Sequence, residues 1–218
     1  GGPCAEPVSA FMLAQPRLLP EALASQAANG SEEWFRLRGN SKPLRGQSVV
    51  ILGFGGIATE LVKLLAPFEM QITAMRRKAR GDEEFPVVTT EELPAALATA
   101  DHVINILPDN AESKNFINAE RLAQMKPGAV FHNIGRGTTV DQDALLEWLR
   151  SGHLGAAWLD VTEPEPLAAD HPLRGEKNCF ITPHIAGGHA DESGTLVKHF
   201  LGNLKRYEAG ETLKDRIM

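Results

Sequence analysis

Three polar residues of this chain are of the types that could assist hydride transfer to a ketone next to a carboxylate. Arg136 stands between two glycines, Glu165 between two prolines, and His184 directly after a proline. An arginine can bind the carboxylate and polarise the ketone, while a histidine can donate the proton of the new hydroxyl. A carboxylate beside that histidine keeps its imidazole protonated and oriented. We therefore interpret Arg136, His184 and Glu165 as the substrate-binding cation, the general acid and the partner of that acid.

Each of these residues also has an ordinary structural explanation. The arginine can be part of a solvated turn, and Glu165, like Glu163 in the same loop, can be a surface charge. His184 can be a buried histidine at the end of a strand. No pair of histidines has HExxH or another metal-ligand spacing, so we predict no metal site. The other histidines are interpreted as structural or surface residues: His102, His132, His153, His171, His189 and His199.

A glycine-rich turn predicts where a cofactor for this chemistry would bind. Residues 49–52 are a short apolar run, typical of a strand buried on both faces, and an amphipathic helix is predicted after Gly53-x-Gly55-x-x-Ala58. Gly53 permits a tight turn, Gly55 lets a pyrophosphate approach the backbone, and Ala58 lets the helix pack closely on the strand. A strand, this turn and a helix in that order indicate a dinucleotide site, with an ordinary glycine turn as the alternative.

The end of the next predicted strand, residues 70–75, suggests which dinucleotide binds. A carboxylate roughly 20 residues beyond the glycines usually accepts the ribose hydroxyls in such a fold, but here Arg76 and Arg77 follow the strand. Guanidinium groups bind a 2′-phosphate, which an acid would repel. We therefore favour NADP(H), with NAD(H) as the second choice. The alternative is that the cationic run from Arg76 to Arg80 is only a solvated loop.

Strands and helices alternate from residue 47 onward. Strands are predicted over 49–52, 70–75, 85–88, 101–107, 129–134, 155–161 and 178–182, and helices over 57–65, 90–99, 119–125, 141–150 and 191–208. This alternation predicts an α/β fold with a Rossmann-type, doubly wound parallel sheet. Because the carboxyl ends of parallel strands share one edge, we expect Arg136, His184 and the glycine turn to meet there.

The N-terminal part is expected to lie outside this alternation. Residues 5–28 are predicted to be helical, with a kink or a break into two helices at the prolines. Residues 29–46 are predicted to form a polar, turn-rich arm, whose Trp34 and Phe35 pack either on their own domain or on a partner subunit.

The composition is that of an ordinary globular protein. The formal net charge of −6 over 218 residues argues against nucleic acid or an anionic membrane as the main partner. We find no apolar run long enough to span a membrane and no signal peptide. The two cysteines have no CxxC spacing, so we expect reduced thiols and a cytoplasmic protein.

Four ordered motifs cover nearly the whole chain: Gly53–Ala58, Asn133–Gly137, Leu159–Pro166 and Thr182–Ile185. Together they resemble the D-isomer-specific 2-hydroxyacid dehydrogenase family, in particular its glyoxylate and hydroxypyruvate reductase-like members. The resemblance implies an NAD(P)H-dependent oxidoreductase acting on a small 2-keto or 2-hydroxy acid. In that family the residues matching Arg136, Glu165 and His184 bind substrate, pair with the histidine and act as the acid/base.

The resemblance also implies a set of cofactor contacts. Asp160 matches an aspartate on the nicotinamide side, and the position of Arg76 is basic in the reductase-like members, which agrees with the charge argument. Gly56, Ile57, Leu107, Ile134 and Gly187 match cofactor-lining positions. The residues assigned to the cofactor are therefore Gly53, Gly55, Gly56, Ile57, Arg76, Arg77, Leu107, Pro108, Ile134, Gly135, Asp160 and Gly187.

The resemblance also implies a second, substrate-side domain that closes over the substrate, and we expect most of that domain to be absent from these 218 residues. We divide the chain into an N-terminal helix and arm (1–45), a dinucleotide-binding domain (46–188) and a C-terminal crossing helix (189–218). The terminal helices are expected to link the two domains, and their apolar surface predicts a homodimer. The alternative to an enzyme is a fragment that binds cofactor and self-associates without useful turnover.

Overall fold

A computed structural model of the chain describes residues 2–25, 30–79, 81 and 83–215. The end of the predicted helix over 5–28 and Arg80 of the cationic run therefore lie outside the described residues. The chain divides into two compact units, Gly1–Gly187 and Gly188–Met218, which are described separately. The predicted roles of segments 1–45, 46–188 and 189–218 stay predictions.

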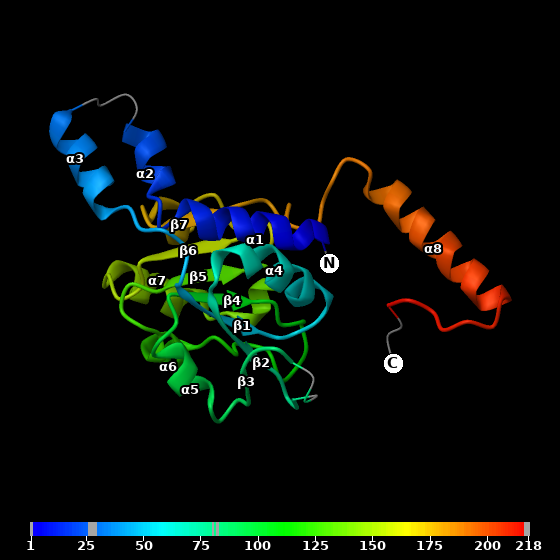
Figure 1. Cartoon of the computed structure of the whole chain (residues 1–218). Helices are drawn as coiled ribbons and strands as arrows, with labels where there is room; N and C mark the ends of the chain where they lie inside the picture. Colours follow the sequence, from blue (N-terminus) through cyan, green and yellow to red (C-terminus); the bar gives the residue numbers. More distant parts are fainter. Residues whose placement is uncertain (1, 26–29, 80, 82, 216–218) are drawn as a thin grey trace. The chain divides into compact units, whose positions relative to one another are not determined.

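In the described chain, seven parallel strands form one sheet in the first unit, in the order β3-β2-β1-β4-β5-β6-β7 (Figure 1). Their bounds are β1 Ser48–Leu52, β2 Gln71–Met75, β3 Val87–Val88, β4 His102–Asn105, β5 Val130–Asn133, β6 Ala156–Leu159 and β7 Cys179–Ile181. The strand order reverses between β1 and β4, and a crevice for ligands forms at such a reversal. The predicted Rossmann-type fold is confirmed.

Helices cover both faces of this sheet. The helices packed on the sheet are α1 Gly2–Ala14, α4 Gly56–Leu65, α5 Leu93–Leu97, α6 Ala119–Gln124 and α7 Gln142–Arg150. Helices α2 Leu19–Ala24 and α3 Ser31–Asn40 bury none of their described residues. Figure 1 shows α1 and α4 on one side of the sheet and α5 and α6 on the other. Two separate apolar clusters follow, one including Met12 and Leu61, the other including Leu97, Leu122 and Phe131. Strands β1, β4 and β5 are consequently buried along nearly their whole length.

Capping side chains set where two of these helices begin. Asn118 precedes α6, and its side chain accepts a hydrogen bond from the Arg121 N–H. Asp141 does the same for the Ala144 N–H of α7. Helix α5 is shorter than the predicted 90–99, because residues 90–92 form a turn and the helix begins at Leu93 with a proline in its first turn.

The N-terminal segment breaks into two helices, which was one of the two predicted alternatives. The prediction of a turn-rich arm over 29–46 is wrong for α3, which forms a helix of 10 residues. Glu32 and Glu33 lie in the first turn of α3, where carboxylates stabilise a helix. The side chains of Trp34 and Phe35 are 55% and 67% exposed. None of the helices formed by the described residues is both long and apolar enough to cross a membrane.

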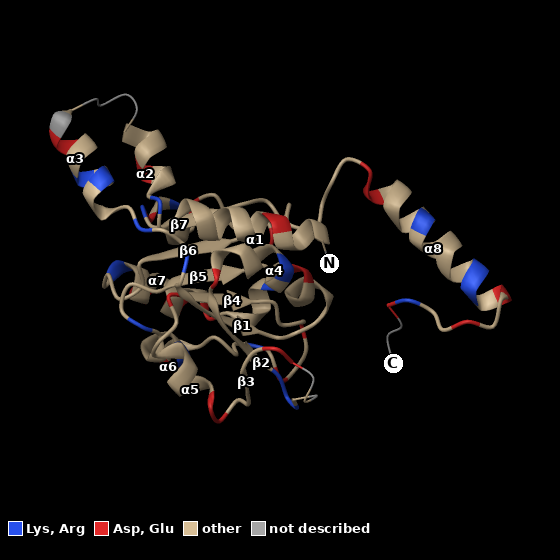
Figure 2. Ribbon diagram, viewed as in Figure 1, with Lys and Arg blue, Asp and Glu red and all other residues tan. Residues whose placement is uncertain are grey.

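The second unit contains α8, Glu192–Glu208. Glu192 lies in its first turn and Lys205 and Arg206 in its last turn, charges that the helix dipole favours there, although Glu208 ends the helix with an acid (Figure 2). Within the described residues none of α8 is buried. Its exposed apolar side chains are Leu196, Val197, Phe200, Leu201, Leu204 and Tyr207.

Candidate active site

The turn between β1 and α4 requires glycine at its first position. Gly53 has φ +90°, and a Cβ there would lie 3.4 Å from the backbone oxygen of Ile106. Its N–H donates a hydrogen bond to the Met75 carbonyl at 3.2 Å, so the turn is held against the end of β2. Any other residue at position 53 would be strained.

Gly55 and Gly56, in contrast, are not required by the packing of the protein. Neither lies in the left-handed region, and a Cβ at either position would meet no described atom within 4 Å. Helix α4 begins at Gly56 without a capping side chain among the described residues, which leaves its first N–H groups for another acceptor. Ala58 is fully buried against β1. Open space beside an uncapped helix N-terminus fits the pyrophosphate of a dinucleotide.

Arg76 lies against this turn, and Arg77 does not. The guanidinium carbon of Arg76 is 5.8 Å from the centre of the Phe54 ring, and Nη1 is 2.8 Å from Glu83 Oε1. The side chain of Arg77 is 91% exposed, with Nη1 3.5 Å from Glu112 Oε2. Arg76 thus lies beside the glycine turn, whereas the exposure of Arg77 agrees better with the solvated-loop alternative. A contact of Arg76 with a ribose phosphate remains a prediction.

The glycines on either side of Arg136 are required by close backbone packing. A Cβ at Gly135 would lie 2.7 Å from the Leu107 carbonyl oxygen, and one at Gly137 would overlap the backbone of Thr162. The loop after β5 thus passes between the ends of β4 and β6. Arg136 itself is exposed, and its Nη1 donates to the Gly135 carbonyl at 2.6 Å.

Buried polar side chains that the sequence does not single out as functional hold the backbone of this loop. Asn105 Nδ2 donates to Asn133 Oδ1 at 2.9 Å and to Thr139 Oγ1 at 2.7 Å. Thr139 Oγ1 and Asn133 Nδ2 in turn donate to the Arg136 carbonyl at 2.6 and 3.2 Å. Polar residues at the ends of two adjacent buried strands are the sequence signal that could have found this network.

His184 and Glu165, which come from the loops after β7 and β6, lie side by side. His184 Nδ1 is 2.7 Å from Glu165 Oε1, and the two side chains are 48% and 37% exposed. His184 has φ +52°, and its N–H donates to the Asp160 and Thr182 carbonyls, both at 3.0 Å. A hydrogen-bonded carboxylate fixes the orientation of the imidazole.

Asp160 holds the backbone on both sides of His184 in the chain. Its buried carboxylate accepts hydrogen bonds from the Thr182 hydroxyl at 2.7 Å and from the N–H groups of Ile185 and Ala186 at 2.9 and 2.8 Å. Asp160 therefore fixes the loop that carries the histidine. The nicotinamide contact implied by the resemblance remains a prediction for this residue.

The other residues assigned to the cofactor by the resemblance come from the segments that follow β1, β4, β5 and β7 along the chain. Ile57, Leu107 and Gly187 are half-buried, Ile134 is buried and Pro108 is exposed. After Pro108 the loop is held by Ser113, whose hydroxyl donates to the Pro108 carbonyl at 2.5 Å. No group of three potential metal ligands occurs among the described residues.

A pair of buried histidines lies within the sheet, with His102 at the start of β4 and His132 next to the last residue of β5. His102 Nδ1 is 3.1 Å from His132 Nε2, and His102 Nε2 is 2.9 Å from Gln47 Oε1. Burial lowers the pKa of His102 to about 4, and burial also lowers the pKa of His132 well below 6.5. Both imidazoles are therefore neutral at pH 7, as is expected for structural histidines.

The parallel sheet, the glycine turn at its switch point and the uncapped helix N-terminus define a dinucleotide-binding α/β domain, with polar side chains gathered at the same edge. The chain belongs to the D-isomer specific 2-hydroxyacid dehydrogenase family. Residues 9–186 match the NAD binding domain of that family, so the family resemblance of the four motifs is confirmed.

Three comparisons illustrate the relationship. The human glyoxylate reductase/hydroxypyruvate reductase is 34% identical over 218 residues, covering 98% of this chain and 66% of the relative. A D-isomer specific 2-hydroxyacid dehydrogenase from Xanthobacter autotrophicus Py2, solved with NADPH and MES, has 30% identity and TM-score 0.81, covering 99% and 87% of the two chains. The NAD-dependent formate dehydrogenase from Staphylococcus aureus, solved with NAD, has 26% identity and TM-score 0.81, covering 98% and 63%. The chain spans 57% to 66% of the length of the first curated relatives that it matches.

Proposed function

We propose that this chain is the cofactor-binding domain of an NAD(P)H-dependent reductase of small 2-keto acids, such as glyoxylate or hydroxypyruvate. The observation that carries the proposal is the hydrogen bond of 2.7 Å between His184 and Glu165, at the edge of the sheet that also bears the glycine turn. Family membership and the human relative's glyoxylate and hydroxypyruvate reductase activity support the same class of reaction.

In the proposed reaction, His184 delivers the proton to the ketone oxygen. Because Nδ1 faces the Glu165 carboxylate, Nδ1 carries a proton, and Nε2 takes no hydrogen bond from the described residues. In the proposed step the imidazolium carries a proton on both nitrogens, gives the one on Nε2 to the ketone oxygen and keeps the one on Nδ1 toward Glu165. The bound cofactor would supply the hydride. Arg136 binds the substrate carboxylate through its exposed guanidinium.

The preferred cofactor in this proposal is NADP(H), with NAD(H) as the second choice. The position of Arg76 beside the glycine turn supports the choice, because a guanidinium binds a 2′-phosphate. Among the similar solved structures, the 2-hydroxyacid dehydrogenase from Xanthobacter autotrophicus Py2 holds NADPH and the formate dehydrogenase from Staphylococcus aureus holds NAD. Dissociation constants for NADPH and NADH, measured on the wild-type chain, test whether NADP(H) is preferred over NAD(H).

Turnover is tested by following the loss of reduced-cofactor absorbance with glyoxylate or hydroxypyruvate. His184→Ala is expected to lower kcat about a hundredfold or more, and Glu165→Gln about tenfold or more. Glu163→Gln removes an exposed acid from the same loop and should leave kcat unchanged. Full activity in His184→Ala would contradict the assigned acid.

A second candidate is a domain that binds cofactor and self-associates without useful turnover. The half-exposed state of the His184 and Glu165 side chains favours it, since keto-acid reduction benefits from a site closed to water. The exposed Trp34 and Phe35 would provide an apolar surface for a second copy. Tight NADPH binding without turnover, together with a dimer in light scattering, would support this candidate over the enzyme.

A further inference from the structure

The loop after β2 carries an acid that engages Arg76. Glu83 Oε1 is 2.8 Å from Arg76 Nη1, and the two side chains are only 7% and 14% exposed. The second carboxylate oxygen of Glu83 accepts a hydrogen bond from the Gly81 N–H at 2.8 Å. Glu83 therefore contacts both the guanidinium and the backbone of Gly81, and the pair is largely shielded from solvent screening.

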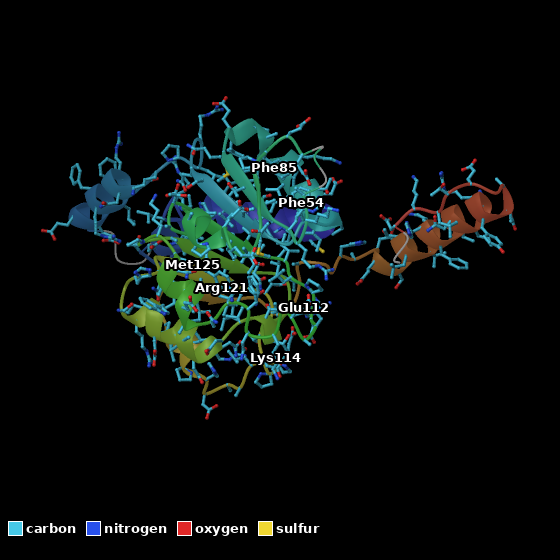
Figure 3. The ribbon with its side chains drawn as sticks, turned by 90° about the horizontal axis from the view of Figure 1, so that it is seen from below. Phe54, Phe85, Glu112, Lys114, Arg121 and Met125 are labelled. Carbon is cyan, nitrogen blue, oxygen red and sulfur yellow. The ribbon has the colours of Figure 1, made fainter. Side chains whose placement is uncertain are left out.

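This ion pair lies where the adenosine ribose of a dinucleotide would bind. Arg76 follows β2 directly, and the preceding residue, Met75, accepts a hydrogen bond from the Gly53 N–H. The ring of Phe54, next to Gly53, lies under the Arg76 guanidinium and packs on Phe85 with ring centres 5.0 Å apart. Figure 3 shows Phe54 and Phe85 close together, with Glu112 apart from them. In this fold the residue after β2 contacts the ribose of a nucleotide on the glycine turn.

We propose that Glu83 limits the preference for NADP(H) by competing with the 2′-phosphate for Arg76. The inference rests on the proposed function, because it requires that the glycine turn binds NAD(P)(H). A 2′-phosphate has to take the guanidinium from Glu83, or else lie beside a carboxylate of the same charge. NADH carries no phosphate there, and the carboxylate can instead accept a ribose hydroxyl. The arginines by themselves predict a stronger preference for NADP(H) over NAD(H) than the site would have, because Glu83 competes for Arg76.

A second arginine–glutamate pair provides the control. Arg77 and Glu112 are of the same residue types, but their side chains are 91% and 78% exposed and the closest atoms are 3.5 Å apart. Solvent screens such a pair, and its contribution is small. Removing the charge of Glu112 should therefore leave the cofactor preference as it is.

The test measures dissociation constants of the 218-residue chain for NADPH and NADH, and for the shorter probes 2′,5′-ADP and 5′-AMP. Glu83→Gln keeps the size of the side chain and removes its charge. It is expected to tighten NADPH and 2′,5′-ADP binding about tenfold, and to leave NADH and 5′-AMP unchanged or weaker. Glu112→Gln should change each constant less than about twofold.

Two further variants connect the effect to Arg76. In an Arg76→Ala background, Glu83→Gln should no longer change the ratio of the NADPH and NADH constants, because the contested group is absent. Glu83→Asp draws the carboxylate back from the guanidinium, so it should shift the ratio in the same direction by a smaller factor. Glu83→Asp decides the question if Glu83→Gln does not fold, as judged by circular dichroism.

An unchanged ratio in a folded Glu83 variant would overturn the inference, and so would an equal shift in the Arg76→Ala background. Binding of both nucleotides with no effect of Glu83 would leave the proposed function standing. A wild-type chain that binds neither nucleotide would instead contradict the proposed function, and this inference with it.

Discussion

Two glycine-rich turns lie at the same edge of the sheet and use glycine for different reasons. In the turn after β1, Gly55 and Gly56 border open space, so their missing side chains leave room for a ligand. In the turn after β5, Gly135 and Gly137 press against the backbone of neighbouring loops, so their missing side chains leave room for the protein itself. A glycine can thus serve binding or folding, and adding a methyl group distinguishes the two.

The largest expected effect of such a methyl group is at Gly137. Gly137→Ala would place a Cβ on the backbone of Thr162, and neither backbone can move without disturbing the loops that carry Arg136 and Glu165. We expect the free energy of unfolding to fall by about 4 kcal/mol or more. Urea unfolding followed by circular dichroism measures the change. A loss below about 1 kcal/mol would show that the two loops adapt easily. It would contradict the view that the glycines after β5, unlike Gly55 and Gly56, are required by packing.

The second-largest loss of stability is expected at Asn105, whose side chain holds the Arg136 loop from the end of β4. Asn105→Ala removes donors to Asn133 and Thr139, which leaves buried polar atoms with fewer partners. The expected loss is about 3 kcal/mol in the free energy of unfolding. Asn118→Ala, which removes the cap of α6, serves as a comparison with an expected loss of about 1 kcal/mol. Equal losses in the two variants would mean that the buried network contributes no more than a surface cap.

Gly53 combines the two uses of glycine. Gly53→Ala has to adopt φ +90° and approaches Ile106, so we expect a loss of about 1 to 2 kcal/mol. Nucleotide affinity should fall as well, because the turn that bears the N-terminus of α4 would shift. Unfolding and NADPH titration on the same variant measure both effects, and a variant with wild-type stability would contradict the strained conformation.

The smallest effect on stability is expected at Gly55. Gly55→Ala meets no described atom within 4 Å, so the free energy of unfolding should stay within about 0.5 kcal/mol of wild type. NADPH binding should nevertheless weaken about tenfold or more, because the new methyl group occupies the space for the pyrophosphate. Gly39→Ala adds a methyl group in similarly open space on α3 and should leave binding unchanged. Undiminished NADPH binding by Gly55→Ala would place the pyrophosphate elsewhere.

The sequence predicts the fold well because apolar strand runs alternate with amphipathic helices. The parallel topology then brings the loops of His184 and Glu165 to one edge, as expected from their positions after strands. The prediction of a turn-rich arm over 29–46 was wrong because Gly30 and Gly39 indicate turns, whereas Ser31–Asn40 has acids in its first turn that favour a helix.

What the sequence does not indicate depends on contacts made only in the folded chain. The spacing of Gly135 and Gly137 suggests exposure of Arg136, but the reason for both glycines is the backbone of Leu107 and Thr162, in the loops after β4 and β6. The ion pair of Arg76 with Glu83 likewise joins two side chains seven residues apart in the chain. The sequence therefore indicates the positive charge of Arg76 but not its ion pair with Glu83.

The buried pair of His102 and His132 makes folding of the first unit a proton-releasing process in mild acid. The pKa of His102 is about 4 in the folded chain against an ordinary value of 6.5, so near pH 5 the unfolded chain binds about one more proton at this site. The contribution of neutral His102 to the free energy of unfolding is fully present above pH 6.5 and is lost as the pH falls toward 4. The lowered pKa of His132 acts in the same direction. The unfolding enthalpy near pH 5 should consequently vary with the ionisation enthalpy of the buffer, although neither histidine takes part in the proposed chemistry.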